Sequence, residues 1–327
     1  MRYEGPEKSP CAFAGIDESL LPPGVTLRKG KVRDIIDLGD ALILVATDRM
    51  SAFDRAITVL PSKGEILNRL ALYWFGKTRD IVDNHLIRQV SPRAALVRKA
   101  EVLPVEVVVR GYITGSAWRS YERGSAVPGL SAPAVGEPGG LRFNQKLPEP
   151  QITPSTKAEH GAHDEPISSE DIVAQGLVAA PLWEQVQRVA LHLFKRGSEI
   201  ASRRGLILVD TKYEFGVRDG RLLLVDEIHT PDSSRYWFSD SYRDLFEAGQ
   251  KQRKVDKEYL RQWLMSEGFQ GEGSVPHVGD DVLHELEKRY IEAFELITGT
   301  KYLPECEGSE AETRNILSCI EEYTHER

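Results

Sequence analysis

Apolar positions follow a strand pattern in the first third of the chain and a helical pattern in the last third. Residues 26–48 predict two strands joined by a turn at 38–40, and the nearly continuous apolar run over 41–46 predicts that the second strand is buried. Another β-rich run covers 105–109. Between these runs, residues 63–81 carry apolar side chains every three or four positions, which predicts a helix.

The rest of the chain predicts one hairpin and several helices. Residues 123–154 are rich in proline and glycine and predict a long loop. Ser169, followed by acidic residues, places a helix start near Glu170. The remaining predicted elements are a hairpin over 206–230 and amphipathic helices over 181–205, 254–268 and 280–299. Because strands dominate the first third and helices the last, the predicted fold class is α+β.

Composition narrows the class of protein. Of 327 residues, 41% are hydrophobic and 28% are charged, which is typical of a globular chain. The net charge of -8 argues against a protein that binds nucleic acid nonspecifically, but it leaves room for a local anion site. Cys11, Cys306 and Cys319 are far apart and form no CxxC, so we expect reduced thiols and a cytoplasmic location. No apolar run is long enough to suggest a membrane partner.

The predicted hairpin carries the pattern that points most clearly to chemistry. Asp210, Lys212 and Glu214 are separated by single residues, so the two-residue period of a strand places all three on one face. The returning strand ends in Asp226 and Glu227. Clustered carboxylates with oxygen ligands only suit Mg²⁺ that is shared with substrate phosphates. The alternative is a solvated face with surface ion pairs.

The turn of this hairpin decides which acid lies opposite Lys212. A two-residue Asp-Gly turn pairs Arg218 with Arg221 and places Glu227 opposite Lys212. A three-residue Arg-Asp-Gly loop with a left-handed glycine places Asp226 there instead. The sequence alone leaves both registers open.

Other segments carry residues that can bind anions. Lys31 follows a glycine early in a strand pair, where backbone amides and a lysine can hold phosphates, although the P-loop string is absent and a basic surface turn is the alternative. Arg110 ends a buried strand shortly before a Gly-Ser turn at Ser116, which suits an anion clamp or a local ion pair. His160 and His163 lack a third ligand at suitable spacing, which argues against zinc.

Five blocks follow one another along the chain: GKVRDIIDLGD, DRMSAFD, VVVRGYITGSAW, KLPEPQITPSTKAEHGAHDEPIS, and VDTKYEFG with VDEIHTPDSSRYW. In this order they resemble the SAICAR synthetase (phosphoribosylaminoimidazole-succinocarboxamide synthase) family, and the resemblance covers residues 20–265. One departure is Ile36, where the family usually has tyrosine. We expect this difference to change packing and not the phosphate contacts.

The resemblance implies a two-lobed α+β fold similar to the ATP-grasp enzymes. A mostly antiparallel N-terminal lobe, 1–105, would cover ATP, and a larger α+β lobe, 106–327, would carry the metal and substrate sites, with C-terminal helices packing back on the first lobe. The implied activity is that of a ligase of de novo purine biosynthesis. It would join L-aspartate to the carboxylate of the carboxylated aminoimidazole ribonucleotide (CAIR) through an acyl phosphate, giving SAICAR, ADP and phosphate. The implied partners are these small molecules and Mg²⁺, and no protein partner is implied.

The resemblance also implies roles for single residues, grouped by ligand. The residues expected to bind ATP are Lys31 and Arg33 at its phosphates, Leu103 near the adenine, and Glu106 towards the ribose. The residues expected to bind Mg²⁺ are Glu214 and Asp226, with Asp210 and Lys212 completing a catalytic site. The residues expected to bind the substrate are Arg110, Ser116 and Arg235 at its phosphate, Ser51 and Asp54 at its imidazole, and Lys157.

Two other classes of function are weaker interpretations of the same residues. A kinase-like phosphotransferase shares the lysine-bearing lobe and the Mg²⁺ acids, but the H-R-D-x-x-x-x-N and D-F-G signatures are absent. A nucleotide sensor without catalysis would not need so complete a set of carboxylates.

Overall fold

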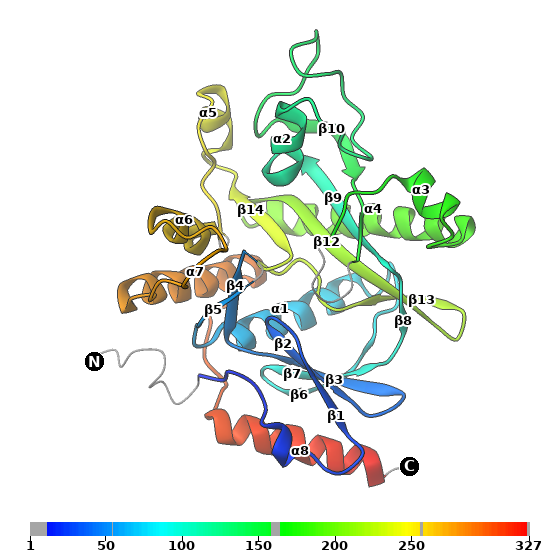
Figure 1. Ribbon diagram of the computed structural model, residues 1–327, viewed down its shortest axis with the longest axis vertical. Coiled ribbons are helices and arrows are strands. Elements are labelled where there is room, and N and C mark those ends of the chain that lie inside the picture. The colour runs from blue at the N-terminus through cyan, green and yellow to red at the C-terminus, as the bar shows by residue number, and fades with distance from the viewer. Residues whose placement is uncertain (1–11, 54, 158–163, 256–257, 326–327) are drawn as a thin grey trace. The chain divides into compact units, whose positions relative to one another are not determined.

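The computed structural model describes residues 12–53, 55–157, 164–255 and 258–325 (Figure 1). Contacts divide the chain into two compact units. Unit 1 comprises Met1–Phe75, His85–Lys99 and Asp256–Arg327, and unit 2 comprises Gly76–Asn84 and Ala100–Val255. The C-terminal helices, which the sequence analysis placed in the second lobe and expected to pack back on the first, therefore cluster with unit 1.

Unit 1 is built on a five-stranded antiparallel sheet. Its strands, in spatial order, are β1 (Thr26–Lys29), β2 (Arg33–Asp37), β3 (Ala41–Ala46), β7 (Ala94–Arg98) and β6 (Leu86–Ser91). The other elements of this unit are η2 (Glu18–Leu20), β4 (Arg49–Ala52), β5 (Arg55–Val59), α1 (Lys63–Thr78), α6 (Glu258–Ser266), α7 (Asp280–Thr298) and α8 (Ser309–His325). Strands β4 and β5 form a separate antiparallel ribbon.

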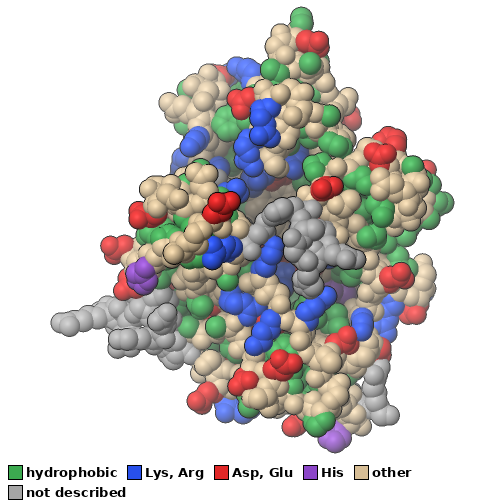
Figure 2. Space-filling model, viewed as in Figure 1, with side chains coloured by type: hydrophobic (Ala, Val, Ile, Leu, Met, Phe, Trp, Pro, Cys, Tyr) green, Lys and Arg blue, Asp and Glu red, His purple; other side chains and the backbone are tan. Residues whose placement is uncertain are grey.

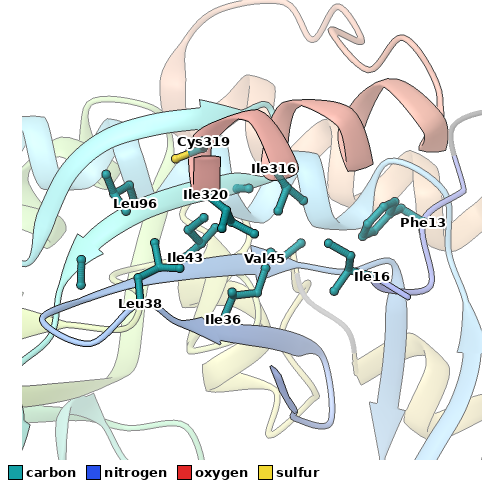
Figure 3. Packing of buried hydrophobic residues seen from close by; sticks show 12 residues of the cluster. Phe13, Ile16, Ile36, Leu38, Ile43, Val45, Leu96, Ile316, Cys319 and Ile320 are labelled. Atoms are coloured by element: carbon teal, nitrogen blue, oxygen red, sulfur yellow. The ribbon is translucent and has the colours of Figure 1, made fainter. Parts of the chain in front are cut away.

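One hydrophobic core of unit 1 joins both ends of the chain to this sheet (Figure 3). Ile43 and Val45 alternate toward the core from β3, Phe13 and Ile16 enter from the N-terminal segment, and α8 supplies residues of its apolar stripe. Ile36 of β2 is fully buried in the same cluster, so the position of this departure lies in the core. Burying such side chains is the main favourable term that stabilises the unit.

Unit 2 is built around the long strand β12. Its strands are β12 (Leu206–Arg218), β9 (Val105–Tyr112), β10 (Lys146–Ile152), β13 (Arg221–Val225), β14 (Ser234–Phe238), β8 (Glu101–Val102) and β11 (Ser155–Thr156). Its helices are α2 (Gly115–Glu122), α3 (Ser169–Ala174), α4 (Ala180–Ser202) and α5 (Tyr242–Glu247). Strand β12 pairs with β9 and β14 over its first half and with β13 and β8 over its second half. Helix α4 packs its apolar stripe against β12 and β9.

The fold confirms the α+β class and most predicted elements, with three corrections. The single strand expected before residue 38 is divided at Gly30 into β1 and β2. The long loop expected over 123–154 contains β10, whose prolines are accommodated because it is an edge strand. Ser168, one residue earlier than expected, caps α3 by accepting a hydrogen bond from the Asp171 backbone.

Two findings in the described part of the chain concern the cysteines and the helices. Cys306 and Cys319 are free thiols, while Cys11 lies outside the described residues. None of the described helices has the length and apolar character needed to cross a bilayer.

Candidate active site

Strand β12 places charged side chains at two points of one sheet face in unit 2. Asp210 lies between Arg110 of β9 and Arg235 of β14 in the strand register. Further along β12, Lys212 and Glu214 contact each other through their side chains, which confirms that they share a face. Asp210 and Glu214 lie four residues apart on this strand, a span of about 13 Å, and they bind different side chains.

The first group, which we call the arginine cluster, consists of Arg110, Asp210 and Arg235. One oxygen of Asp210 accepts hydrogen bonds from Arg110 Nη1 at 2.8 Å and from Arg235 Nη1. Arg110 Nε donates to Thr153 Oγ1 at 2.8 Å, which fixes the plane of its guanidinium. The side chains of Arg110 and Asp210 are 10% and 5% exposed, and that of Arg235 is 32% exposed. Two cations thus share one carboxylate, and the cluster retains a net positive charge.

The first turn of α2 lies against the arginine cluster. Gly115, the first residue of α2, has a φ of 61°, and a Cβ at this position would come within 2.7 Å of Arg235 Nη2. Glycine is therefore needed for this close approach. The side chain of the preceding residue, Thr114, makes no capping hydrogen bond, and Ser116 is exposed in the same turn. Gly115, which precedes Ser116 in this turn, thus lies against Arg235, with the positive end of a helix dipole beside them. The role of Ser116 at the substrate phosphate stays a prediction.

The second group, which we call the lysine–carboxylate cluster, consists of Glu106, Lys157, Lys212 and Glu214. Lys212 Nζ lies 2.5 Å from Glu106 Oε1 and 3.0 Å from Glu214 Oε1, and Lys157 Nζ contacts the other oxygen of Glu214. Burial works against the charged form of Lys212, yet the carboxylates of Glu214, Glu106 and Asp226 raise its pKa above the ordinary value. The Lys212 side chain is therefore an ammonium ion at neutral pH.

The turn between β12 and β13 has the two-residue register. Arg218 pairs directly with Arg221, so the turn consists of Asp219 and Gly220. Both have positive φ values, 52° and 70°, as a type I′ turn requires. Of the two registers that the sequence left open, the structure has the one that would bring Glu227 opposite Lys212 if the ladder continued.

The ladder does not continue, because the chain turns away at Asp226. Strand β13 ends at Val225, and Asp226 follows with a φ of 64°, a left-handed conformation that aspartate tolerates better than most residues. Glu227 is buried and accepts a hydrogen bond from Thr230 Oγ1 at 2.5 Å. Asp226 is one of the carboxylates that raise the pKa of Lys212. The bend, and not the turn, thus brings Asp226 toward the cluster.

The donor atoms of this cluster fit Mg²⁺ only if a substrate shares the ion. Among the residues that the structure describes, no three His, Cys, Asp or Glu side chains form a ready metal site. Glu214 and Asp226 offer oxygen ligands, and a carboxylate has about four acceptor positions, so Glu214 retains capacity beside its two lysines. Mg²⁺ is commonly held by one or two carboxylates together with phosphate oxygens. The residues therefore fit a shared ion and not a cage made of protein alone.

The remaining predicted ATP residues lie in both units. In unit 1, Lys31 is exposed in the loop between β1 and β2, and Arg33 is half-buried at the start of β2. In unit 2, Leu103 is buried and donates its backbone N–H to Phe215 O at 2.8 Å. Glu106, which the resemblance assigned to the ribose, has its carboxylate on Lys212.

The predicted imidazole contacts belong to unit 1. Ser51 is half-buried on β4, whereas Asp54, like His160 and His163, lies outside the described residues. Basic side chains are exposed on the face drawn in Figure 2, so the negative net charge does not prevent basic surface from forming locally.

Sequence reasoning missed how these residues are partnered. It grouped Asp210 with Lys212, whereas the structure pairs Asp210 with two arginines. It also missed Thr153, which orients Arg110. The signal that would have found both is the strand register of β9 against β12 and β10, and such a long-range pairing is not visible in local sequence patterns.

Comparisons with known proteins agree with the resemblance. Residues 26–277 match the family model described as SAICAR synthetase. The phosphoribosylaminoimidazole-succinocarboxamide synthase of Bacteroides thetaiotaomicron is 47% identical over 297 residues, covering 89% of this chain and 91% of the relative. That of Legionella pneumophila is 47% identical over 295 residues, covering 88% and 92%. A solved structure of SAICAR synthase from Saccharomyces cerevisiae, complexed with SAICAR, has a TM-score of 0.76 and 36% identity, and covers 89% of this chain and all of that one.

Proposed function

This chain belongs to the SAICAR synthetase family, and from that premise we propose that it is the ATP-dependent ligase that joins L-aspartate to the carboxylate of CAIR in purine biosynthesis. The products are SAICAR, ADP and phosphate. The observation that supports this proposal most strongly is the face of β12, which carries an anion-binding cluster and a carboxylate cluster on one strand. The relative from yeast, whose structure contains SAICAR, supports the choice of product.

The chemistry explains why ATP is consumed. A carboxylate is a poor acyl donor, because its leaving group would be oxide. Transfer of the γ-phosphoryl group of ATP to a carboxylate oxygen of CAIR gives an acyl phosphate and ADP. The amine nitrogen of aspartate then attacks the acyl carbon, the C–N bond forms and the C–O bond to phosphate breaks. The phosphate leaves with one former carboxylate oxygen, and the nitrogen loses a proton to water.

On the ATP side, Lys31 and Arg33 bind phosphates, and Leu103 contacts the adenine. Glu214 and Asp226 would hold Mg²⁺, which when bound neutralises charge on the phosphate oxygens. The ammonium of Lys212 lies among carboxylates in this cluster, where it balances their charge and keeps them in place. Glu106 keeps its proposed ribose contact through the carboxylate oxygen that does not bind Lys212.

On the CAIR side, Arg110, Arg235 and Ser116 bind the ribonucleotide phosphate. Asp210 acts through both arginines, since it holds their guanidinium groups beside each other and lowers the repulsion between them. The proposed contacts nearer the imidazole ring are Ser51, Asp54 and Lys157.

No general base is assigned in this mechanism. The raised pKa of Lys212 keeps that side chain protonated, so it cannot accept a proton from the amine. The amine of aspartate therefore enters in its deprotonated form. The cytoplasmic location expected from the sequence stays a prediction.

The activity is tested with the purified chain, ATP, Mg²⁺, CAIR and L-aspartate. We expect a new product absorbance and stoichiometric ADP, and neither when CAIR or aspartate is omitted. Absence of product with all components present would overturn the proposed reaction, and phosphoryl transfer to a hydroxyl without aspartate would identify a kinase instead. With ¹⁸O in the CAIR carboxylate, the released phosphate should carry label; unlabelled phosphate would remove the acyl-phosphate step.

A further inference from the structure

In unit 1, the loop of residues 30–32 between β1 and β2 directs its carbonyl groups onto one arginine. Arg49 Nη2 donates to Gly30 O at 2.9 Å, and Arg49 Nε donates to Lys31 O at 3.4 Å. A guanidinium offers five N–H donors in a rigid plane, so one arginine can hold two successive carbonyl groups in fixed directions. Lysine has no such fork.

The third carbonyl of the loop is held in the same way by Thr47. Val32 O accepts from Thr47 N at 3.1 Å and from Thr47 Oγ1 at 2.8 Å. A trans peptide unit is planar, with its N–H pointing opposite to its C=O. Because the carbonyls of Gly30 and Lys31 face Arg49, the N–H groups of Lys31 and Val32 face away from it. Successive amides that point to one side form a concavity suited to an anion.

The arginine is itself held by a buried carboxylate. Arg49 Nη2 lies 2.7 Å from Asp34 Oδ1, and Asp34 is fully buried. The other oxygen of Asp34 accepts the backbone N–H of Ile16 at 3.0 Å. Arg49 Nη1 donates to Ala14 O at 2.5 Å. The segment 13–16 thus binds both Arg49, through Ala14 O, and the carboxylate that holds it, through Ile16 N.

Gly15 shows how closely this segment approaches. A Cβ at Gly15 would lie 2.5 Å from Asp34 Oδ2 and 2.7 Å from Arg49 Nη1, and the φ of 139° also favours glycine. This contact comes from the N-terminal segment, which precedes the part of the chain that matches the family model, residues 26–277.

We propose that Arg49 is a positioning residue for ATP: it fixes the peptide planes of the 30–32 loop so that their amides face the nucleotide phosphates. Asp34 and the segment 13–16 keep Arg49 in the required orientation. This inference rests on the proposed function, in which Lys31 of the same loop binds ATP. Arg49 acts through the loop backbone and does not touch the nucleotide.

The test compares ATP binding and steady-state kinetics of five variants of the 327-residue chain. Arg49→Gln should weaken ATP binding, measured by calorimetry, by about 10- to 100-fold and raise the KM for ATP by a similar factor. The KM values for CAIR and aspartate should stay within about twofold. Arg49→Lys keeps the positive charge but lacks the planar set of N–H donors, so its ATP binding should remain weakened. Gly15→Ala should weaken ATP binding to a smaller extent. Arg28→Gln, an exposed arginine on β1, is the matched control and should bind ATP as the parent does.

The outcomes separate this inference from the proposed function. A folded Arg49→Gln variant that binds ATP as tightly as the parent would overturn the positioning role. Normal ATP binding by Arg49→Lys, or a defect in Arg28→Gln as large as that in Arg49→Gln, would also overturn it, because positive charge alone would then explain the effect. Equal rises in all three KM values would show a general structural defect and would also overturn it. Lys31→Ala tests the premise: if that variant binds ATP normally, the loop is not the phosphate site and the proposed function itself needs revision.

Discussion

The arginine cluster and the lysine–carboxylate cluster use the same strand but have opposite charge balances. In the first, Arg110 and Arg235 both bind one carboxylate oxygen of Asp210, so these three residues carry more positive than negative charge. In the second, the ammonium groups of Lys157 and Lys212 meet the carboxylates of Glu106 and Glu214, and the neighbouring Asp226, which acts electrostatically on Lys212, adds one further negative charge. One strand thus carries two clusters of opposite charge balance because the side chains on its neighbours differ.

The two clusters also differ in the kind of cation that each uses. The guanidinium of Arg110 is held by Asp210 and Thr153 and is therefore preorganised for a phosphate. Lys157 and Lys212 carry compact charges on flexible stems, which can exchange a carboxylate partner for a phosphate oxygen. Rigid cations suit a site that recognises a substrate, and mobile ones suit a site where charge moves during the reaction.

The largest expected effect concerns the carboxylates of the second cluster. Glu214→Gln or Asp226→Asn should lower kcat by at least about 100-fold, because each removes an oxygen anion that would hold Mg²⁺. The fold should persist, since asparagine tolerates the left-handed backbone of position 226. The measurements are kcat at saturating Mg²⁺ and the circular dichroism melt.

Glu101→Gln, an exposed acid on β8, is the control for loss of one negative charge. We expect the kcat of this control to stay within about threefold of the parent. If the kcat of Glu214→Gln or Asp226→Asn also stayed within that range, the metal would lie elsewhere and the comparison between the clusters would fail.

An intermediate effect is expected at the arginine cluster. Arg235→Ala should raise the KM for CAIR by about 10- to 100-fold, the worth of a charge-assisted hydrogen bond, with little change in kcat. Arg221→Ala on β13 removes an exposed arginine from the same sheet and should leave the KM unchanged. An unaltered KM for CAIR in Arg235→Ala would refute the phosphate-binding role of this cluster.

The smallest expected effect is the pH dependence of Lys212. The pKa of Lys212 is raised in the folded chain. Its charge therefore contributes fully to the free energy of unfolding at pH values below its pKa in the unfolded chain, about 10.4, and this contribution is lost only as the pH rises through its pKa in the folded chain. The difference in unfolding free energy between the parent and Lys212→Met should therefore be the same at pH 6 and pH 9 in urea titrations. A difference that shrinks between these pH values would mean that Lys212 loses its proton there and can serve as a base.

The local patterns of the sequence predicted the site better than its long-range pairings. The alternation of Asp210, Lys212 and Glu214 gave the shared face of β12, because strand periodicity depends only on neighbouring residues. The pairing of Asp210 with Arg110 joins residues 100 positions apart and depends on which strands lie side by side. Nothing in either local segment encodes that choice.

Backbone conformation at single residues was the other part that the sequence did not reveal. The sequence offered two turn registers for the β12–β13 hairpin, but the position of Asp226 depends on its own left-handed conformation and on neither register alone. Similarly, the split of the first strand depends on Gly30, where a Cβ would lie 2.9 Å from Arg33 O. A tight turn of this kind is easily mistaken for a continuing strand.

The uninterrupted course of β12 through both clusters has a consequence for how this family can change in evolution. Between Asp210 and Tyr213 the pairing with β9 shows no register shift, so successive side chains alternate strictly between the two faces. Deleting or inserting one residue there would turn every later side chain to the opposite face. Substitutions along this stretch can adjust the chemistry gradually, whereas a change in length removes one of the two sites at once. We therefore expect natural variation in length to accumulate in the loops and not in this strand.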